Sequence, residues 1–228
     1  MLLLAIDTSG RHGSIALAEG DARHFRALEL VPLGAGTYSA QLVPQISALL
    51  VRHGFEKDAI DAFAAVSGPG SFTGLRVGLS TVKALAEVMQ RPIAAVSLLE
   101  AVAYSAGDQG TTIAALDAGR GQVYLGEYQV GAGSTRRLRE WIATFDELLA
   151  ARRADADLPL VTPDDSVHRA LQAHGFTARL IPAPRADTIA RLGLAKILSG
   201  DTVQPEVLDA NYIRRSDAEL FSLPKLSS

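Results

Sequence analysis

Hydrophobic and polar positions along the first half of the chain follow two periods, one of strands and one of helices. Short apolar runs closed by small or polar residues predict buried strands. Apolar residues recurring every three to four positions predict amphipathic helices. The expected strands are Leu2–Ile6, Ser14–Ala18, His24–Leu30, Ala62–Ser67 and Ile93–Val96. The expected helices are Tyr38–His53, Thr73–Gln90 and Leu98–Ser105.

The pattern then starts again at about half the chain length. AIDTSGRHGSIAL at Ala5–Leu17 and ALDAGRGQVYL at Ala115–Leu125 each show an aliphatic strand, a terminal Asp (Asp7, Asp117), a small-residue turn and a returning strand. Such a repeat predicts two duplicated lobes, although two similar hairpins also arise by chance. The remaining expected elements are strands 112–116, 122–129 and 160–161 and helices 144–153, 166–174 and 188–199.

The length and composition fit this two-lobed organisation. The 228 residues are 48% hydrophobic, which is enough to bury a sizeable core. We expect residues 1–105 to form an N-terminal lobe and residues 106–215 a C-terminal lobe. The polar, proline-containing residues 216–228 are expected to form a loose tail.

Charge and composition exclude several classes of protein. A formal net charge of -3 argues against a stand-alone nucleic-acid binder. The lack of cysteine excludes disulfides, thiolate metal sites and a cysteine nucleophile. No apolar run approaches the ~20 residues of a membrane span, and the N-terminus lacks the basic region of a signal peptide. We therefore expect a cytoplasmic protein without a membrane association.

A glycine-rich stretch, SGPGSFTGLRVG at Ser67–Gly78, joins a predicted strand to a predicted helix. It fits neither the phosphate-binding P-loop, nor the dinucleotide fingerprint, nor the nucleophile elbow. Ser71 or Thr73 can cap the helix, and its free N–H groups could hold an anion or a nucleotide. A capped turn without any ligand accounts for the stretch equally well.

The two aspartates that end equivalent strands also admit two interpretations. In a two-lobed fold Asp7 and Asp117 would face the cleft between the lobes, where a carboxylate can hold Mg²⁺ or orient water. Alternatively, each carboxylate caps its own turn, which is the interpretation we favour. The five histidines include no i, i+4 pair on a predicted helix, so no histidine metal site is expected.

The helix Thr73–Gln90 carries more apolar surface than packing on one sheet requires. At ~100° per residue, its apolar and small residues cover roughly 220° of the circumference, whereas a surface helix needs a stripe of about 100°. Gly74 and Gly78 form a strip that another backbone can approach closely. The helix Tyr38–His53 has a similar excess. Either both helices are deeply buried within one domain or a protein partner covers them.

Several of these motifs together resemble the TsaB (YeaZ) family of tRNA threonylcarbamoyladenosine biosynthesis proteins. They are LLAIDTS at Leu3–Ser9, GPGSFTGLRVG at Gly68–Gly78, DAGRGQVYLGEY at Asp117–Tyr128 and PEVLDANYIRR at Pro205–Arg215. The resemblance implies an α/β, actin-like fold of the sugar kinase and Hsp70 (ASKHA) type. Such a fold has two duplicated lobes with mixed central sheets flanked by helices.

The resemblance also implies a role without catalysis. The subunit would bind and support its catalytic paralogue TsaD, and the ATPase TsaE would join them. The complex modifies N6 of the adenosine next to the tRNA anticodon. TsaD is implied to carry metal-binding histidines at i, i+4 on the first long helix, where this chain has Tyr38 and Leu42. TsaB members usually have a histidine at the start of this helix, so Tyr38 departs from the family pattern.

The implied partners and cofactors follow from this role. The chain alone would form a homodimer, contact tRNA only through the complex and hold no tightly bound cofactor, with ATP or ADP and Mg²⁺ bound only in the complex. The expected partner interface consists of Tyr38, Gln41, Leu42, Gln45, Leu49, Gly74, Leu75, Gly78, Val82, Leu85 and Met89. The expected anion or nucleotide contacts are Asp7, Ser71, Thr73 and Asp117. The alternative function is an independent actin-fold ATPase or peptidase.

Overall fold

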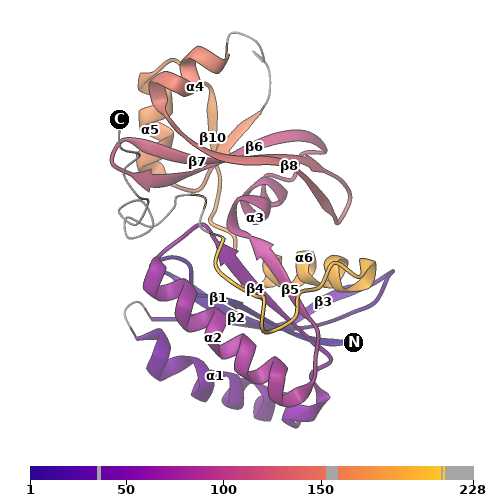
Figure 1. Ribbon diagram of the computed structural model, residues 1–228. Coiled ribbons are helices and arrows are strands. Elements are labelled where there is room, and N and C mark those ends of the chain that lie inside the picture. Colours follow the sequence, from indigo (N-terminus) through magenta and orange to yellow (C-terminus); the bar gives the residue numbers. More distant parts are fainter. Residues whose placement is uncertain (35–36, 153–158, 212, 214–228) are drawn as a thin grey trace, which may run out of the picture.

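The computed structural model describes residues 1–34, 37–152, 159–211 and 213, which form two lobes with one five-stranded sheet each (Figure 1). The first sheet has the order β3-β2-β1-β4-β5 and the second β10-β9-β6-β7-β8. The strands of the first sheet are β1 (Leu2–Asp7), β2 (Gly13–Gly20), β3 (Phe25–Leu33), β4 (Ala62–Gly68) and β5 (Ile93–Ser97). Those of the second are β6 (Gly110–Gly119), β7 (Gln122–Val130), β8 (Thr135–Thr144), β9 (Leu160–Thr162) and β10 (Ala178–Leu180).

The two sheets have the same topology. In each, the first three strands pair antiparallel and the last two join in parallel. The matching strand directions confirm the duplication that the two Asp-turn motifs predicted. They also confirm the expected fold class, an α/β protein with mixed sheets flanked by helices.

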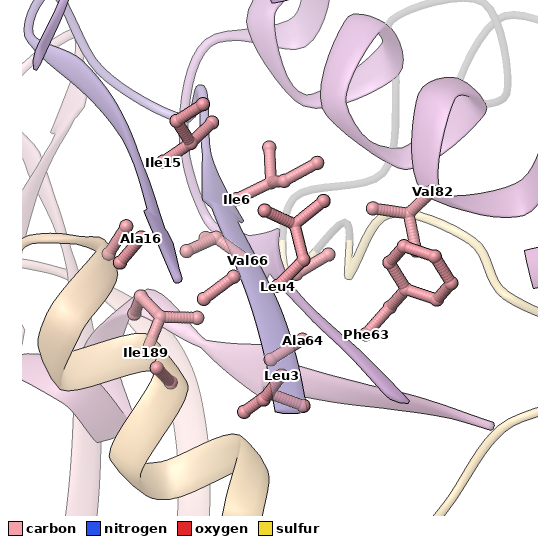
Figure 2. Close-up of a cluster of buried hydrophobic side chains, with 14 of the residues drawn as sticks. Leu3, Leu4, Ile6, Ile15, Ala16, Phe63, Ala64, Val66, Val82 and Ile189 are labelled. Atoms are coloured by element: carbon pink, nitrogen blue, oxygen red, sulfur yellow. The ribbon is translucent and has the colours of Figure 1, made fainter. Parts of the chain in front are cut away.

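Helices cover both faces of the first sheet (Figure 1). The helices of the chain are α1 (Tyr38–Arg52), α2 (Phe72–Met89), α3 (Leu98–Ser105), α4 (Phe145–Arg152), α5 (Asp165–Ala173) and α6 (Ala186–Ser199), with a 3-10 turn η1 (Lys57–Ala59). Leu4 and Phe63 point toward Val82 of α2, whereas Leu3 points toward Ile189 of α6 (Figure 2). A strand covered on both faces is apolar at successive positions, which is why β1 reads as a continuous apolar run.

The last helix returns to the first lobe, so the expected lobe boundaries 1–105 and 106–215 are wrong. The helix α6 packs on β1, β2, β4 and β5. The N–H of Ala186 donates to Ser14 Oγ at 2.9 Å, and Val203 forms a bridge with Ile93. The helix α3 also differs, since Leu99 lies in the core of the second lobe. Residues 216–228, the expected tail, lie outside the described residues.

The sequence pattern missed two strands. The strand β8 lies at the edge of its sheet, and most of its side chains are exposed or half-buried, so it shows no apolar run. The strand β10 has only three residues, none of them buried. Among the described residues, no helix is long and apolar enough to cross a membrane.

Candidate functional site

A cleft of about 710 Å³ lies between the lobes, within the size range of small-molecule sites. The first lobe contributes the turn after β1 and the start of α2, and the second lobe contributes Leu116 and Asp117 of β6, Tyr124 and Asp164. Both lobes are therefore needed to form the cleft. The cleft residues used below are Ser9, Gly10, Gly70, Ser71, Thr73, Gly74, Leu98, Asp117 and Asp164.

The glycine loop fixes the start of α2 against the turn after β1. Ser71 Oγ accepts the N–H of Gly74 at 3.3 Å, so Ser71 is the N-cap. Ser71 is one of the two residues that the sequence offered as a cap, the other being Thr73. The N–H of Ser71 donates to Ser9 O at 2.7 Å, and Thr8 Oγ1 donates to Gly74 O at 2.7 Å. The loop is thus bonded to the chain's own backbone on one side and borders the cleft on the other.

Gly74 and Gly78 face this same turn. A Cβ atom at Gly74 would lie 2.0 Å from Thr8 O, and one at Gly78 would lie 2.3 Å from Thr8 Oγ1. Real Cβ atoms do not make such contacts, so both positions need glycine. The expectation that this strip receives a partner's backbone is wrong, because the backbone that approaches it is that of the β1–β2 turn.

The two aspartates close their own turns. Asp7 Oδ1 accepts the N–H of Ser9 at 2.8 Å and its hydroxyl at 2.6 Å. Burial raises the pKa of Asp7, and the two bonds from Ser9 oppose the shift. Asp117 Oδ1 accepts the N–H of Gly119 at 2.7 Å, and its own N–H donates to Asp164. Asp117 lines the cleft and Asp7 does not. In the described part of the chain, no cluster of three or more His, Cys, Asp or Glu residues could hold a metal ion.

Tyr38 has a structural role at the start of α1. Its side chain is buried, and its hydroxyl donates to Gly10 O at 2.7 Å. Burial raises the pKa of this phenol, so it remains a hydrogen-bond donor at neutral pH. Tyr38 therefore ties α1 to the β1–β2 turn.

Most residues of the expected partner interface are buried within the first lobe. The buried ones are Tyr38, Leu42, Leu49, Gly74, Leu75, Gly78 and Val82. The partly exposed ones are Gln41, Gln45, Leu85 and Met89. The buried residues pack against the sheet or the β1–β2 turn. Their assignment to a partner interface is therefore wrong, because they lie inside the first lobe and not on its surface.

About half of the exposed positions on α1 and α2 are nevertheless apolar. Among the described residues ten large hydrophobic side chains are exposed, and four of them lie on these two helices: Val43 (57%), Val51 (73%), Phe72 (48%) and Val88 (78%). Exposed Ala40, Pro44, Ala48 and Ala84 lie on the same two helices. We call these eight residues the outer face. The apolar excess in the sequence signalled this face, but the excess could not separate its residues from the buried ones.

Comparison with known proteins decides the family. Residues 31–161, more than half of the chain, match the family model described as "TsaD: tRNA N6-adenosine threonylcarbamoyltransferase". The chain belongs to this family. Within it, the chain is similar to proteins named TsaB or YeaZ, as the sequence motifs indicated.

Two relatives and one solved structure define the similarity. The "tRNA threonylcarbamoyladenosine biosynthesis protein TsaB" of Bacillus subtilis is 29% identical over 228 residues, with 96% of each chain covered. The Escherichia coli protein of the same name is 37% identical over 134 residues, which cover 57% of this chain and 55% of that protein. The structure "YeaZ from Pseudomonas aeruginosa" has a TM-score of 0.75 and 27% identity, and the match covers 92% of this chain and 100% of that one. The two-lobed fold of this TsaD-family chain is thus that of YeaZ.

Proposed function

We propose that this chain is a non-catalytic subunit in the synthesis of threonylcarbamoyladenosine in tRNA. Its role is to bind and support a catalytic TsaD-type partner. The observation that carries this proposal is the apolar outer face of α1 and α2 on a chain similar to TsaB over nearly its whole length. The ATPase TsaE joins the pair, and the assembly works in the cytoplasm.

The energetics of the outer face favour a protein partner. Covering apolar surface stabilises an assembly by about 25 cal/mol per Å². Val43, Val51 and Val88 are each more than half exposed, so a large part of each side chain remains for another chain to cover. A twofold homodimer is the commonest way to cover such a face, so the isolated chain self-associates and exchanges this contact for the TsaD-type partner.

The residues of α1 support the non-catalytic role. The position where TsaD-type proteins are implied to hold the first metal ligand is Tyr38, a buried phenol bonded to Gly10 O. The position one turn later is Leu42, which is 1% exposed in the core. This pair of side chains is not a metal-binding pair, and the chain contains no i, i+4 histidine pair on a helix. The transfer step is therefore assigned to the partner.

The cleft offers a nucleotide site only jointly with a partner. Ser71, Thr73 and Asp117 border it, and the capped N-terminus of α2 opens toward it. ATP or ADP with Mg²⁺ would bind there within the assembly, while the chain alone holds no tightly bound cofactor. The competing function, an independent ATPase or peptidase, has the volume of this cleft as its supporting observation.

A reconstitution tests the proposal. The purified chain, a TsaD-type protein, TsaE and unmodified tRNA are combined with ATP, threonine, bicarbonate and an enzyme that forms the threonylcarbamoyl adenylate from these three compounds. Mass spectrometry then measures threonylcarbamoyladenosine in the tRNA. We expect the product only when this chain and the TsaD-type protein are both present. Product formed by this chain alone, or ATP hydrolysis by this chain alone that Asp117→Asn abolishes, would overturn the proposal.

A further inference from the structure

Glu140 of β8 joins both lobes through one buried carboxylate. Its side chain is 6% exposed. Oε1 accepts hydrogen bonds from the hydroxyls of Ser97 and Tyr128, and Oε2 accepts the amide N–H of Asn211 at 2.7 Å. Oε2 also lies 3.6 Å from Nη1 of Arg137, which belongs to the same strand. Tyr128 belongs to the second lobe, as Glu140 does, whereas Ser97 ends β5 of the first lobe. We call Glu140, Ser97, Tyr128 and Asn211 the Glu140 cluster.

Asn211 belongs to a segment that the first lobe holds firmly. Within residues 201–211, Val203 bridges Ile93 at the edge strand of the first sheet. Leu208 is 2% exposed in the first core, and its carbonyl accepts the Lys83 ammonium of α2 at 2.8 Å. The N–H of Asn211 itself donates to Ser67 O at 2.6 Å. Through Ser97 and Asn211, Glu140 therefore holds two separate points of the first lobe.

The Glu140 cluster and the interlobe cleft lie on either side of the junction between β5 and α3. Ser97 and Asn211 line a polar cavity of about 500 Å³. The next residue after Ser97, Leu98, lines the cleft of about 710 Å³ instead. Among the described residues, none lines both cavities. A change in the angle between the lobes at the cluster therefore changes the distance across the cleft.

Because the Glu140 carboxylate is buried, its hydrogen bonds favour one arrangement of the two lobes. A carboxylate removed from water needs most of its acceptor sites filled, and leaving it or its donors unpaired costs more than the bonds contribute. Two of the three donors, Ser97 and Asn211, come from separate segments of the first lobe, so both reach Glu140 only when the two lobes keep this arrangement. An ordinary surface ion pair, such as that between Arg139 and Glu127 within the second lobe, has no such requirement.

We propose that Glu140 is a positioning residue that fixes the angle between the two lobes and, through it, the width of the interlobe cleft. The consequence for a TsaD-type partner rests on the proposed function, because a joint site needs the two walls of the cleft at one separation. The angle itself is a property of this chain alone and is measured without any partner.

Spin-label distances test the angle directly. The chain has no cysteine, so Glu56→Cys in the first lobe and Ser166→Cys in the second, both exposed, provide the only two labelling sites. Pulsed electron resonance on the full chain measures the distance distribution between them. We expect a single narrow distribution for the parent, and a broader distribution displaced from it for Glu140→Ala. Unchanged distributions would overturn the proposal.

Matched variants separate the contact from general damage. Asn211→Ala removes one first-lobe contact and leaves the Glu140–Tyr128 bond within the second lobe, so it should broaden the distribution even where Glu140→Ala does not fold. Glu140→Gln keeps an acceptor for both hydroxyls, and its amide can pair with a flipped Asn211 amide, so it should keep the narrow distribution. Glu127→Ala, which breaks the Arg139 pair inside one lobe, should leave it unchanged. Broadening by Glu127→Ala equal to that of Asn211→Ala would contradict the proposal.

A second measurement connects the angle to the proposed function. In the reconstitution, Asn211→Ala should reduce threonylcarbamoyladenosine formation while a pull-down retains the TsaD-type partner, since the outer face is untouched. A parent chain that supports no modification would contradict the proposed function and leave the distance result standing. A parent that works beside an equally active Asn211→Ala with a broadened angle would refute the coupling of angle to cleft.

Discussion

The inner side of α2 and the apolar residues on its exposed side, such as Ala84 and Val88, serve different purposes. On the inner side Gly74 and Gly78 touch the β1–β2 turn so closely that no side chain fits. On the outer side Val88 is 78% exposed. Apolar character alone therefore does not identify an interface. The inner side holds the lobe together, and only the outer side is available to a partner.

We expect the largest effect from a substitution on the inner side of α2. Gly74→Leu places a side chain where a Cβ atom would lie 2.0 Å from Thr8 O. We expect a loss of about 3 kcal/mol or more in the free energy of unfolding, since overpacking against backbone cannot be relieved by a rotamer change. Thermal unfolding of the dilute chain measures it. Ser80→Leu, on the exposed side of the same helix, is the control, and equal melting of the two variants would refute the division of the helix into two sides.

A substitution on the outer side of α2 should change association of the chain and should change its folding little. Val88→Glu puts a charge on the face that a second copy covers in the proposed homodimer. We expect the dissociation constant of the homodimer to rise about 10- to 100-fold, at about 1.4 kcal/mol per tenfold. Sedimentation over a concentration series measures this. Leu198→Glu, on an exposed apolar position of α6, should not change it. A homodimer as tight as that of the parent would show that another surface forms it.

Asp7 stands directly before the turn that packs against the inner side of α2, and we expect it to make the stability of the fold depend on pH. Burial raises the folded-state pKa of Asp7, so the folded state binds a proton more tightly than the unfolded state. The stability that this group contributes is therefore fully present below the unfolded-state pKa and is lost as pH rises through the raised folded-state pKa. Asp7→Asn, which keeps an acceptor for Ser9, should be more stable than the parent at neutral pH. The gain is about 1.4 kcal/mol for each pH unit that separates the folded-state from the unfolded-state pKa.

The advantage of Asp7→Asn should disappear below the ordinary carboxyl pKa of about 3.9. Urea unfolding at a series of pH values measures it. Asp117→Asn is the control, since this carboxyl group is exposed. An Asp7→Asn variant that is less stable than the parent at neutral pH would contradict the role of burial at this turn.

We expect the smallest effect on stability from removal of the cap at the start of α2. Ser71→Ala removes the side-chain cap and should cost about 1 kcal/mol. Thr73→Ala should cost less, because the cap bond of the helix is made by Ser71 and Thr73 is exposed. Chemical unfolding of both variants compares them. A larger loss from Thr73→Ala would show that Ser71 is not the residue that stabilises this end.

Strand and helix positions were predictable from the sequence wherever burial followed one period. The bounds of α3 were predicted to the residue, and those of α2 to within one residue at each end. The edge strand β8 was not, because half-exposed positions interrupt the apolar pattern. The return of α6 to the first lobe was not predictable either. The apolar stripe of α6 is compatible with packing on either lobe. The helix packs on the first lobe because one face of the first sheet would otherwise be uncovered, and the sequence pattern does not show this.

The candidate site was predictable in outline but not by residue. The apolar excess pointed to the two helices that carry the outer face, and the cap and the Asp turns follow local rules of hydrogen bonding. Which arc of α2 faces the sheet depends on Thr8, a residue far away in the sequence. Val82 and Val88 are alike in the sequence, whereas one is buried and the other is largely exposed. The Glu140 cluster joins residues from four separate segments and gives no local signal at all.

The role of the outer face in tRNA modification is best tested by two substitutions made together. Val43→Glu and Val88→Glu are combined in one chain, and threonylcarbamoyladenosine in tRNA is measured in the complete reconstitution. We expect the product to be lost while the dilute variant melts as the parent does, because both positions are exposed and belong to the proposed partner contact. A variant that folds normally and supports full modification would show that this face does not carry the function.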